Sequence, residues 1–248
     1  MGCGALFAQN SFRITVGGSM PIGNFGKAKV INNAVDKWAL LTNDKSGYGG
    51  AGMGFSVGLQ EKIGFPSVEG LGVILSIDGF YNGLNSELND VYEETAESLE
   101  HDEDIKDVSL KTQKHLNFAP MAGVNYEYNL NESFGIFAEV GLGANMRKIT
   151  NLSLEIDGTD GLSYYGKDKY DIKFSFAYKI GLGVIVGNRF VIGIHYFGLG
   201  TSKVTGKSEM NGYEEGDYGN WNETIEKSKI KGGKVNPMLL TLSVGVQF

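Results

Sequence analysis

Three histidines, His101, His115 and His195, are the side chains most suited to catalysis or metal binding in this sequence. None of them stands at a spacing typical of metal ligands. His195 could act with a strand-borne serine such as Ser175 and an acid, because a base beside a hydroxyl is the arrangement that activates a nucleophile. A lone histidine on a strand more often packs in an interior or an interface. The glycine repeats are not phosphate loops, since no strand–loop–helix unit surrounds them. The sequence therefore predicts no catalytic residues, no metal and no cofactor.

The elements that carry these residues alternate apolar and small or polar side chains with a period of two, which is typical of strands with one apolar face. The closing stretch PMLLTLSVGVQF shows this most clearly. Eight segments follow the pattern: 11–20, 50–60, 70–81, 115–129, 135–148, 173–186, 189–200 and 237–248. The sequence thus predicts an all-β protein with an even number of strands.

The connections between these segments alternate in length. Three are short, at 61–69, 129–133 and 187–188, and four are long, at about 21–49, 83–113, 150–171 and 201–234. Short turns on one side and long loops on the other are typical of a transmembrane up-and-down β-barrel. No stretch approaches the roughly 18 apolar residues of a membrane helix. We therefore expect an antiparallel transmembrane β-barrel of eight strands, or of ten if a long loop forms a hairpin.

The two faces of the expected strands differ in a way that supports a narrow barrel. Glycine makes up 37 of the 248 residues, and most glycines fall on the face opposite the apolar one. Small residues allow eight tilted strands to close, while the apolar face would meet lipid. The few ionic groups on the small-residue face carry both signs, and buried charges require such pairing. We predict an interior charge network of Arg13, Asp78, Glu127, Glu139, Arg147, Lys173 and Lys179.

Aromatic side chains complete the expected lipid face. Those near strand ends would form belts at the membrane interfaces, namely Tyr81, Tyr126, Tyr128, Phe174 and Phe190. The chain also ends on Phe248, preceded at every second position by Leu242, Val244 and Val246.

The chain resembles the small porin-like outer-membrane β-barrel family of Gram-negative bacteria. The opening FRITVGGSMPIGNFG, the glycine-studded strands and the terminal phenylalanine carry this resemblance. It implies an eight- to ten-stranded barrel in the outer membrane, with periplasmic termini and lipid as its surroundings. It also implies that Leu242, Val244, Val246 and Phe248 form an assembly signal read by the barrel-assembly machinery.

Members of that family include structural anchors, adhesins, narrow pores and a few enzymes that modify lipids. We expect a non-enzymatic structural or surface-interaction role, with a narrow pore for small solutes as the alternative. A lipid-modifying enzyme that uses His195, and a soluble lipocalin-like binder of apolar ligands, are less favoured. The contents of the barrel interior distinguish an anchor from a pore.

The long loops hold most of the charge. The segment 83–113 contains two lysines and ten acids: Glu87, Asp90, Glu93, Glu94, Glu97, Glu100, Asp102, Glu103, Asp104 and Asp107. It lacks the twelve-residue spacing of calcium loops, so we interpret it as a solvated loop rather than as a cation site near lipopolysaccharide. The stretch VYEETAESLEHDED could form a short helix. The rest of the chain is nearly neutral, which gives no indication of a nucleic-acid partner.

The loop 201–234 contains six lysines and the aromatic residues Tyr213, Tyr218 and Trp221. Exposed aromatic side chains among polar ones can mark a binding surface, so an extracellular ligand at the loops is possible. At the other end of the sequence, MGCGALFA resembles the tail of a secretory signal peptide. We therefore divide the chain into a residual signal segment, 1–8, and one barrel domain, 9–248. Cys3 is the single cysteine, so no internal disulfide can form.

Overall fold

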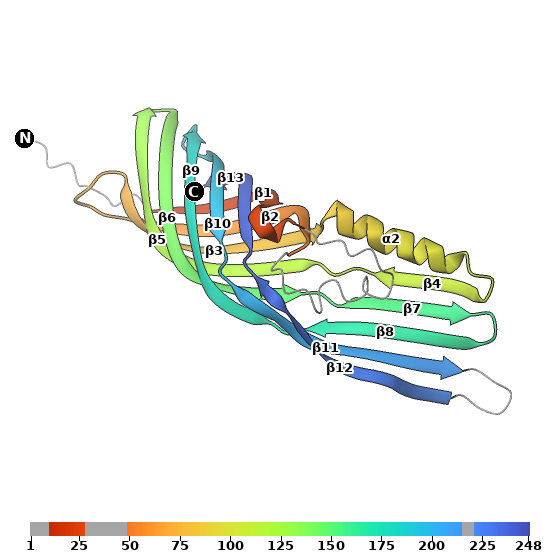
Figure 1. The fold of residues 1–248 in the computed structure, drawn as a ribbon. Helices are drawn as coiled ribbons and strands as arrows, with labels where there is room; N and C mark the ends of the chain where they lie inside the picture. The colour runs from red at the N-terminus through yellow and green to blue at the C-terminus, as the bar shows by residue number, and fades with distance from the viewer. Residues whose placement is uncertain (1–9, 28–48, 215–220) are drawn as a thin grey trace, which may run out of the picture.

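The chain forms a closed barrel of eight antiparallel strands in the computed structural model, which describes residues 10–27, 49–214 and 221–248 (Figure 1). The barrel strands are β1 (Ser11–Pro21), β2 (Ala51–Gly64), β3 (Leu71–Leu84), β5 (His115–Asn131), β6 (Phe134–Ile149), β9 (Lys173–Val186), β10 (Phe190–Gly198) and β13 (Met238–Gln247). These are the eight segments predicted from the alternation, so the up-and-down barrel is confirmed. The expected signal segment 1–8 lies outside the described residues.

The first and last strands close the barrel. Ile14 of β1 is paired with Leu59 of β2 on one side and with Val246 of β13 on the other. The backbones of Phe12 and Phe248 exchange two hydrogen bonds, of 3.0 and 2.9 Å. The terminal phenylalanine is therefore held in the sheet, and the described ends of the chain lie together at the short-turn end of the barrel.

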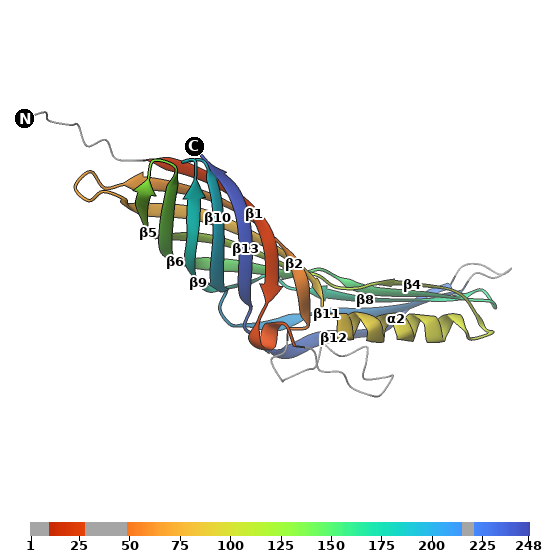
Figure 2. The same cartoon turned by 90° about the horizontal axis from the view of Figure 1, so that it is seen from above.

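A second, five-stranded antiparallel sheet extends from the other end of the barrel (Figure 2). Its strands, in spatial order, are β12 (Trp221–Val235), β11 (Ser202–Glu214), β8 (Leu162–Tyr170), β7 (Leu152–Gly158) and β4 (Ile105–Lys111). The interpretation of 83–113, 150–171 and 201–234 as loops is therefore wrong. Charged and polar side chains predominate on one face of the described part of this sheet, so its strands lack the apolar–small alternation that revealed the barrel.

One α-helix, α2 (Ser86–Glu100), lies among the described residues, and a short 3₁₀ turn, η1 (Gly23–Phe25), follows β1. The helix begins at Asn85, whose side chain accepts a hydrogen bond from the Glu87 backbone and donates one to the Gly26 carbonyl. The helix expected near 91–104 thus exists, although it starts earlier in the chain. No helix in the described part of the chain has the length and apolar character needed to cross a membrane.

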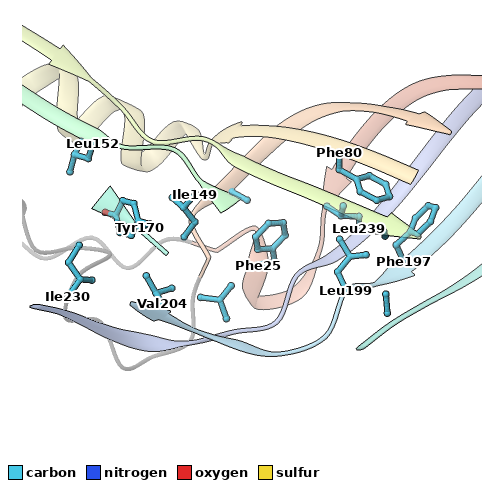
Figure 3. Packing of buried hydrophobic residues seen from close by; sticks show 14 of the residues in the cluster. Phe25, Phe80, Ile149, Leu152, Tyr170, Phe197, Leu199, Val204, Ile230 and Leu239 are labelled. Carbon is cyan, nitrogen blue, oxygen red and sulfur yellow. The ribbon is translucent and has the colours of Figure 1, made fainter. Parts of the chain in front are cut away.

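An apolar cluster joins the barrel mouth to the base of the five-stranded sheet (Figure 3). Phe80 and Phe197 meet edge to face inside the mouth, with their ring centroids 4.7 Å apart. Tyr170 and Ile230 contribute from the five-stranded sheet, and all four side chains are at most 3% exposed. Because the cluster spans both sheets, it fixes the five-stranded sheet to the barrel.

The faces of the barrel wall are arranged as the sequence indicates. Outward side chains such as Phe176 and Leu182 are large, apolar and about 60% exposed. The inward face is lined by small residues, and at Gly181 the reason is steric. A methyl group there would lie 2.2 Å from the ring of His195.

Candidate functional site: a charge network across the barrel lumen

Charged side chains meet across the barrel lumen with Glu139 at their centre. Glu139, on β6, lies 3.0 Å from the Lys179 Nζ atom and 3.5 Å from Arg13 Nη1. His195 Nε2 is 3.3 Å from the same carboxylate. Gln60 donates a 2.9 Å hydrogen bond to it. Glu139 is 3% exposed, so the partners replace the water that this charge has lost.

A second carboxylate extends the network towards the short-turn end of the barrel. Glu127, on β5, is 3.2 Å from Arg13 Nη2 and 3.0 Å from Lys62 Nζ. Arg13 also donates to the Gln247 side chain at 2.9 Å and lies over the ring of Phe137, 4.3 Å from its centroid. Arg13 of the first strand therefore contacts side chains of the last strand, β13, and of β5 and β6.

Lys179 completes the network on its other side. Its ammonium group donates a 2.8 Å hydrogen bond to Gln60 and lies 3.7 Å from the Asp78 carboxylate. The ionic groups are thus Arg13, Lys62 and Lys179 against Asp78, Glu127 and Glu139. Three positive groups face three negative ones, which is the balance that a buried ionic cluster needs.

Five of the seven predicted interior groups belong to this network: Arg13, Asp78, Glu127, Glu139 and Lys179. The other two, Arg147 and Lys173, are not among the contacts of this network. Arg147 is buried in the barrel mouth, where it donates to the Ser202 carbonyl at 3.4 Å and has no acid within ion-pair distance in the described part of the chain. Lys173 lies at the rim, 3.4 Å from Asp171 and partly exposed. Both residues face inward.

The sequence reasoning missed Gln60, Lys62, His195 and Gln247. Lys62 was assigned to a connection, because β2 runs to Gly64 rather than ending at Gln60. Gln60 and Gln247 are uncharged, so the pattern of ionic residues did not indicate them. His195 stands at an inward position between Gly193 and Phe197, so the alternation of β10 carried a usable signal.

The side chains of the network leave little free space among themselves. A cavity of about 20 Å³ remains among the network side chains, and such a volume holds roughly one water molecule. The contacts found there are ion pairs and hydrogen bonds. Ser175, considered as a nucleophile for His195, instead donates to the Leu199 carbonyl at 2.6 Å. His195 is paired with Gly181, six residues further along β9 than Ser175, or about 20 Å. The Ser175–His195 pair is therefore wrong.

The acidic segment does not form a metal site where it is described. Across residues 10–27, 49–214 and 221–248, no three His, Cys, Asp or Glu side chains are grouped to hold a metal ion. Of the aromatic residues noted in loop 201–234, Tyr213 is half-buried on β11, and Tyr218 and the Trp221 side chain lie outside what the structure describes.

The predicted assembly signal lies on the outer face of β13. Leu242, Val244 and Phe248 are exposed there, and Val246 is half-buried beside them. Each points away from the network. The aromatic side chains predicted to form belts lie near both ends of the barrel wall, and Tyr81 stacks on Phe55 with ring centroids 5.1 Å apart.

Comparison with known proteins gives no sequence family. No family model matches the chain, and no curated protein matches it. Solved structures similar in shape include OprG, an outer membrane protein of Pseudomonas aeruginosa. It is 13% identical, covers 97% of each chain and has a TM-score of 0.42.

Two further solved structures are similar at the same level. Neisserial surface protein A is 9% identical, with 96% of this chain and 97% of that chain covered and a TM-score of 0.39. Ail, the attachment invasion locus protein of Yersinia pestis, is 15% identical, with 96% and 99% covered and a TM-score of 0.36. Similarity at this level carries no argument about function, and the assignment of the barrel rests on its own strand pairing.

Proposed function

We propose that this protein is an integral outer-membrane barrel that does not conduct, and that it serves as an anchor for an extracellular surface-interaction sheet. The observation that carries the proposal is the lumen, which is crossed by a neutral network and retains a cavity of about 20 Å³. A hydrated solute needs a continuous path, and the cavity among the network side chains has room for roughly one water molecule.

The outer surface supports insertion in a membrane. Large apolar side chains stay exposed all around the barrel, as at Phe174, Leu182 and Leu242, each at least 60% exposed. Monomeric soluble proteins rarely leave a contiguous apolar surface of this extent in water. A soluble lipocalin-like binder would have the opposite arrangement, with these side chains around an internal cavity.

The two ends of the barrel suggest its orientation. Short turns and the described ends of the chain occupy one end, and the five-stranded sheet with α2 occupies the other (Figure 2). Bacterial outer-membrane barrels keep short turns in the periplasm and longer segments outside. We therefore place the termini in the periplasm, where Leu242, Val244, Val246 and Phe248 would be read by the barrel-assembly machinery.

Planar-bilayer recording tests the proposal. Wild-type protein refolded into a lipid bilayer should give no reproducible single-channel steps. A Glu139→Ala/Lys179→Ala variant should give steps, because both side chains that span the lumen are shortened without a change in net charge. Glu132→Ala/Lys106→Ala, at two exposed sites outside the barrel lumen, is the matched control and should stay silent. Regular steps from the wild type would favour the narrow pore instead.

A further inference from the structure

Lysines gather on one face of the five-stranded sheet. We call this set the lysine face, and its members are Lys167 and Lys169 of β8, Lys203 and Lys207 of β11, and Lys227, Lys229, Lys231 and Lys234 of β12. The strand register puts Lys229 opposite Lys207, and Lys207 opposite Lys169. Three like charges therefore form one row across three neighbouring strands.

The lysine face points away from the apolar cluster. Tyr170, Val204 and Ile230 alternate with these lysines along the same strands, and all three are at most 3% exposed. Seven of the eight lysines are exposed, and Lys167 is half-buried. The side chains are thus available to a ligand from the outside of the molecule.

Within β8, β11 and β12 the described lysines of this face are poorly balanced by acids, and Glu155 of the neighbouring β7 lies on the same face beside Lys167. Glu209 is the one acid on this face among the described side chains of β8, β11 and β12, and it lies 3.6 Å from Lys169. Like charges directly opposite one another on neighbouring strands destabilise a sheet. A polyanion that lies across the row would remove this repulsion, whereas water and salt only weaken it.

The position of the lysine face next to the apolar barrel wall indicates which kind of polyanion it could bind. The outer side of β9 carries the exposed Phe174, the chain continues back through the exposed Ile172, and Lys169 follows on the outer side of β8. Phe174 and Lys169 are five residues apart, or about 17 Å along an extended chain. Since β8 leads directly into β9 (Figure 1), the apolar outer side of β9 is followed along the chain by the lysine face of β8.

We infer that the lysine face binds the phosphate groups of the lipopolysaccharide that surrounds the barrel in the outer leaflet. The inference rests on the proposed membrane orientation, because hydrocarbon then covers the apolar wall and the phosphorylated headgroup and core lie just beyond it. Lysine suits this ligand as a flexible point charge for phosphate. The ligand holds the sheet beside the membrane surface and relieves the repulsion within the lysine row.

Binding of purified lipopolysaccharide to the full chain in detergent tests this inference. The variant Lys169→Gln/Lys207→Gln/Lys229→Gln removes the row and should lower the affinity roughly 10- to 100-fold, since each lysine near an anionic lipid surface contributes a few-fold. The control, Lys27→Gln/Lys106→Gln/Arg189→Gln, loses the same charge from exposed positions outside the lysine face. It should bind within a few-fold of the wild type. Equal losses in the two variants would overturn the inference.

Three further arms use the wild-type protein and do not depend on how the variants fold. Dephosphorylated lipopolysaccharide should bind at least tenfold more weakly than the intact form, and added salt should weaken the binding of the intact form. A soluble sulfated polysaccharide should bind more weakly than lipopolysaccharide. If it binds equally or better, a soluble partner is the ligand and the inference is wrong.

The single-channel recordings and the lipopolysaccharide binding experiments test the proposed function and this inference separately. Single-channel steps from the wild type would contradict the non-conducting barrel and leave the phosphate result standing. A silent, membrane-inserted barrel that binds intact and dephosphorylated lipopolysaccharide equally would contradict only the lysine face.

Discussion

Glu139 is the residue on which the interior depends most. It contacts Lys179, Arg13, His195 and Gln60 inside the barrel. Removing one member of a buried ionic cluster leaves its partner charged and unpaired, and such losses cost about 3–5 kcal/mol. The sequence indicated this residue because an acid on the glycine-lined inner face would be buried, and a buried charge is tolerated only when it is paired.

We predict that Glu139→Gln lowers the free energy of unfolding by about 3 kcal/mol. The urea midpoint of the folded band in lipid vesicles, followed by gel mobility, measures this loss. Glu132→Gln, in an exposed turn, is the control and should change the midpoint little. In a double-mutant cycle, Glu139→Gln with Lys179→Met should cost less than the sum of the single changes. Additive losses would show that the two side chains do not interact.

Glycines of the barrel differ in how tightly they are enclosed. A Cβ atom at Gly123 would lie 2.0 Å from the Val140 backbone oxygen, which cannot move aside. At Gly18, on the lipid side, a Cβ atom would meet nothing within 4 Å. We predict that Gly123→Ala destabilises the barrel by about 2 kcal/mol, while Gly18→Ala stays within about 0.5 kcal/mol. Equal urea midpoints for the two variants would contradict this reading of the wall.

The alternation predicted which glycines face inward, but it could not predict this difference. The difference depends on how closely neighbouring backbones approach at each position, and only the three-dimensional register of β5 and β6 sets that distance.

Among the elements, β8 carries a buried acid beneath the helix. Burial raises the pKa of the Asp168 carboxyl, and the Ser208 and Tyr170 hydroxyl groups lower it by a smaller amount. Burial also raises the pKa of Tyr170 and of Tyr92 on α2, and the nearby charge of Asp168 raises both further. The helix and the sheet therefore meet around a carboxyl group that is more easily protonated in the folded protein.

This arrangement predicts a pH dependence of the five-stranded sheet. A raised folded pKa contributes stability that is fully present below the unfolded value of about 3.9 and is lost as the pH rises through the folded pKa. Protection of α2 and β8 from hydrogen exchange, corrected for intrinsic rates, should therefore fall as the pH rises above about 4.

The variant Asp168→Asn should remove this dependence and increase protection at neutral pH, by on the order of 1 kcal/mol for each unit of raised pKa. The control is Asp107→Asn on β4, at an exposed position, and it should behave like the wild type. An identical pH response in all three proteins would show that Asp168 does not determine it.

The strands of the five-stranded sheet are the elements that the sequence did not predict. The strands β7, β8, β11 and β12 were interpreted as loops, since Lys and Glu cover their outer face and the inner face is apolar only near the barrel. Leu152, Tyr170, Val204 and Ile230 are the buried members of that inner face. They are spaced too widely along the chain to give a period-two signal.

At the scale of the whole molecule, the barrel and the five-stranded sheet differ in whether each can fold without the other. The barrel has no free edge, because β1 is paired with both β2 and β13. The five-stranded sheet ends at β12 and β4 and adds the apolar cluster at its base. The barrel should therefore fold without the sheet.

We predict that replacing 86–111, 152–170 and 202–235 with short turns leaves a barrel that still shifts its gel mobility on heating. The truncated barrel should lose its affinity for lipopolysaccharide, because the lysine face is gone. A chain that no longer folds would show that the apolar cluster at the mouth is needed to close the barrel.

The network can form completely only after all eight barrel strands have paired. Each of the eight barrel strands contributes a side chain to it: Arg13, Gln60, Asp78, Glu127, Glu139, Lys179, His195 and Gln247. Arg13 and Gln247 stand 234 positions apart in the chain, so the set is incomplete until the last strand docks. A strand that pairs one residue out of step turns its polar group towards hydrocarbon. A misaligned barrel would therefore be less stable than the correct one, because at least one of its polar side chains would face lipid instead of its partners in the lumen.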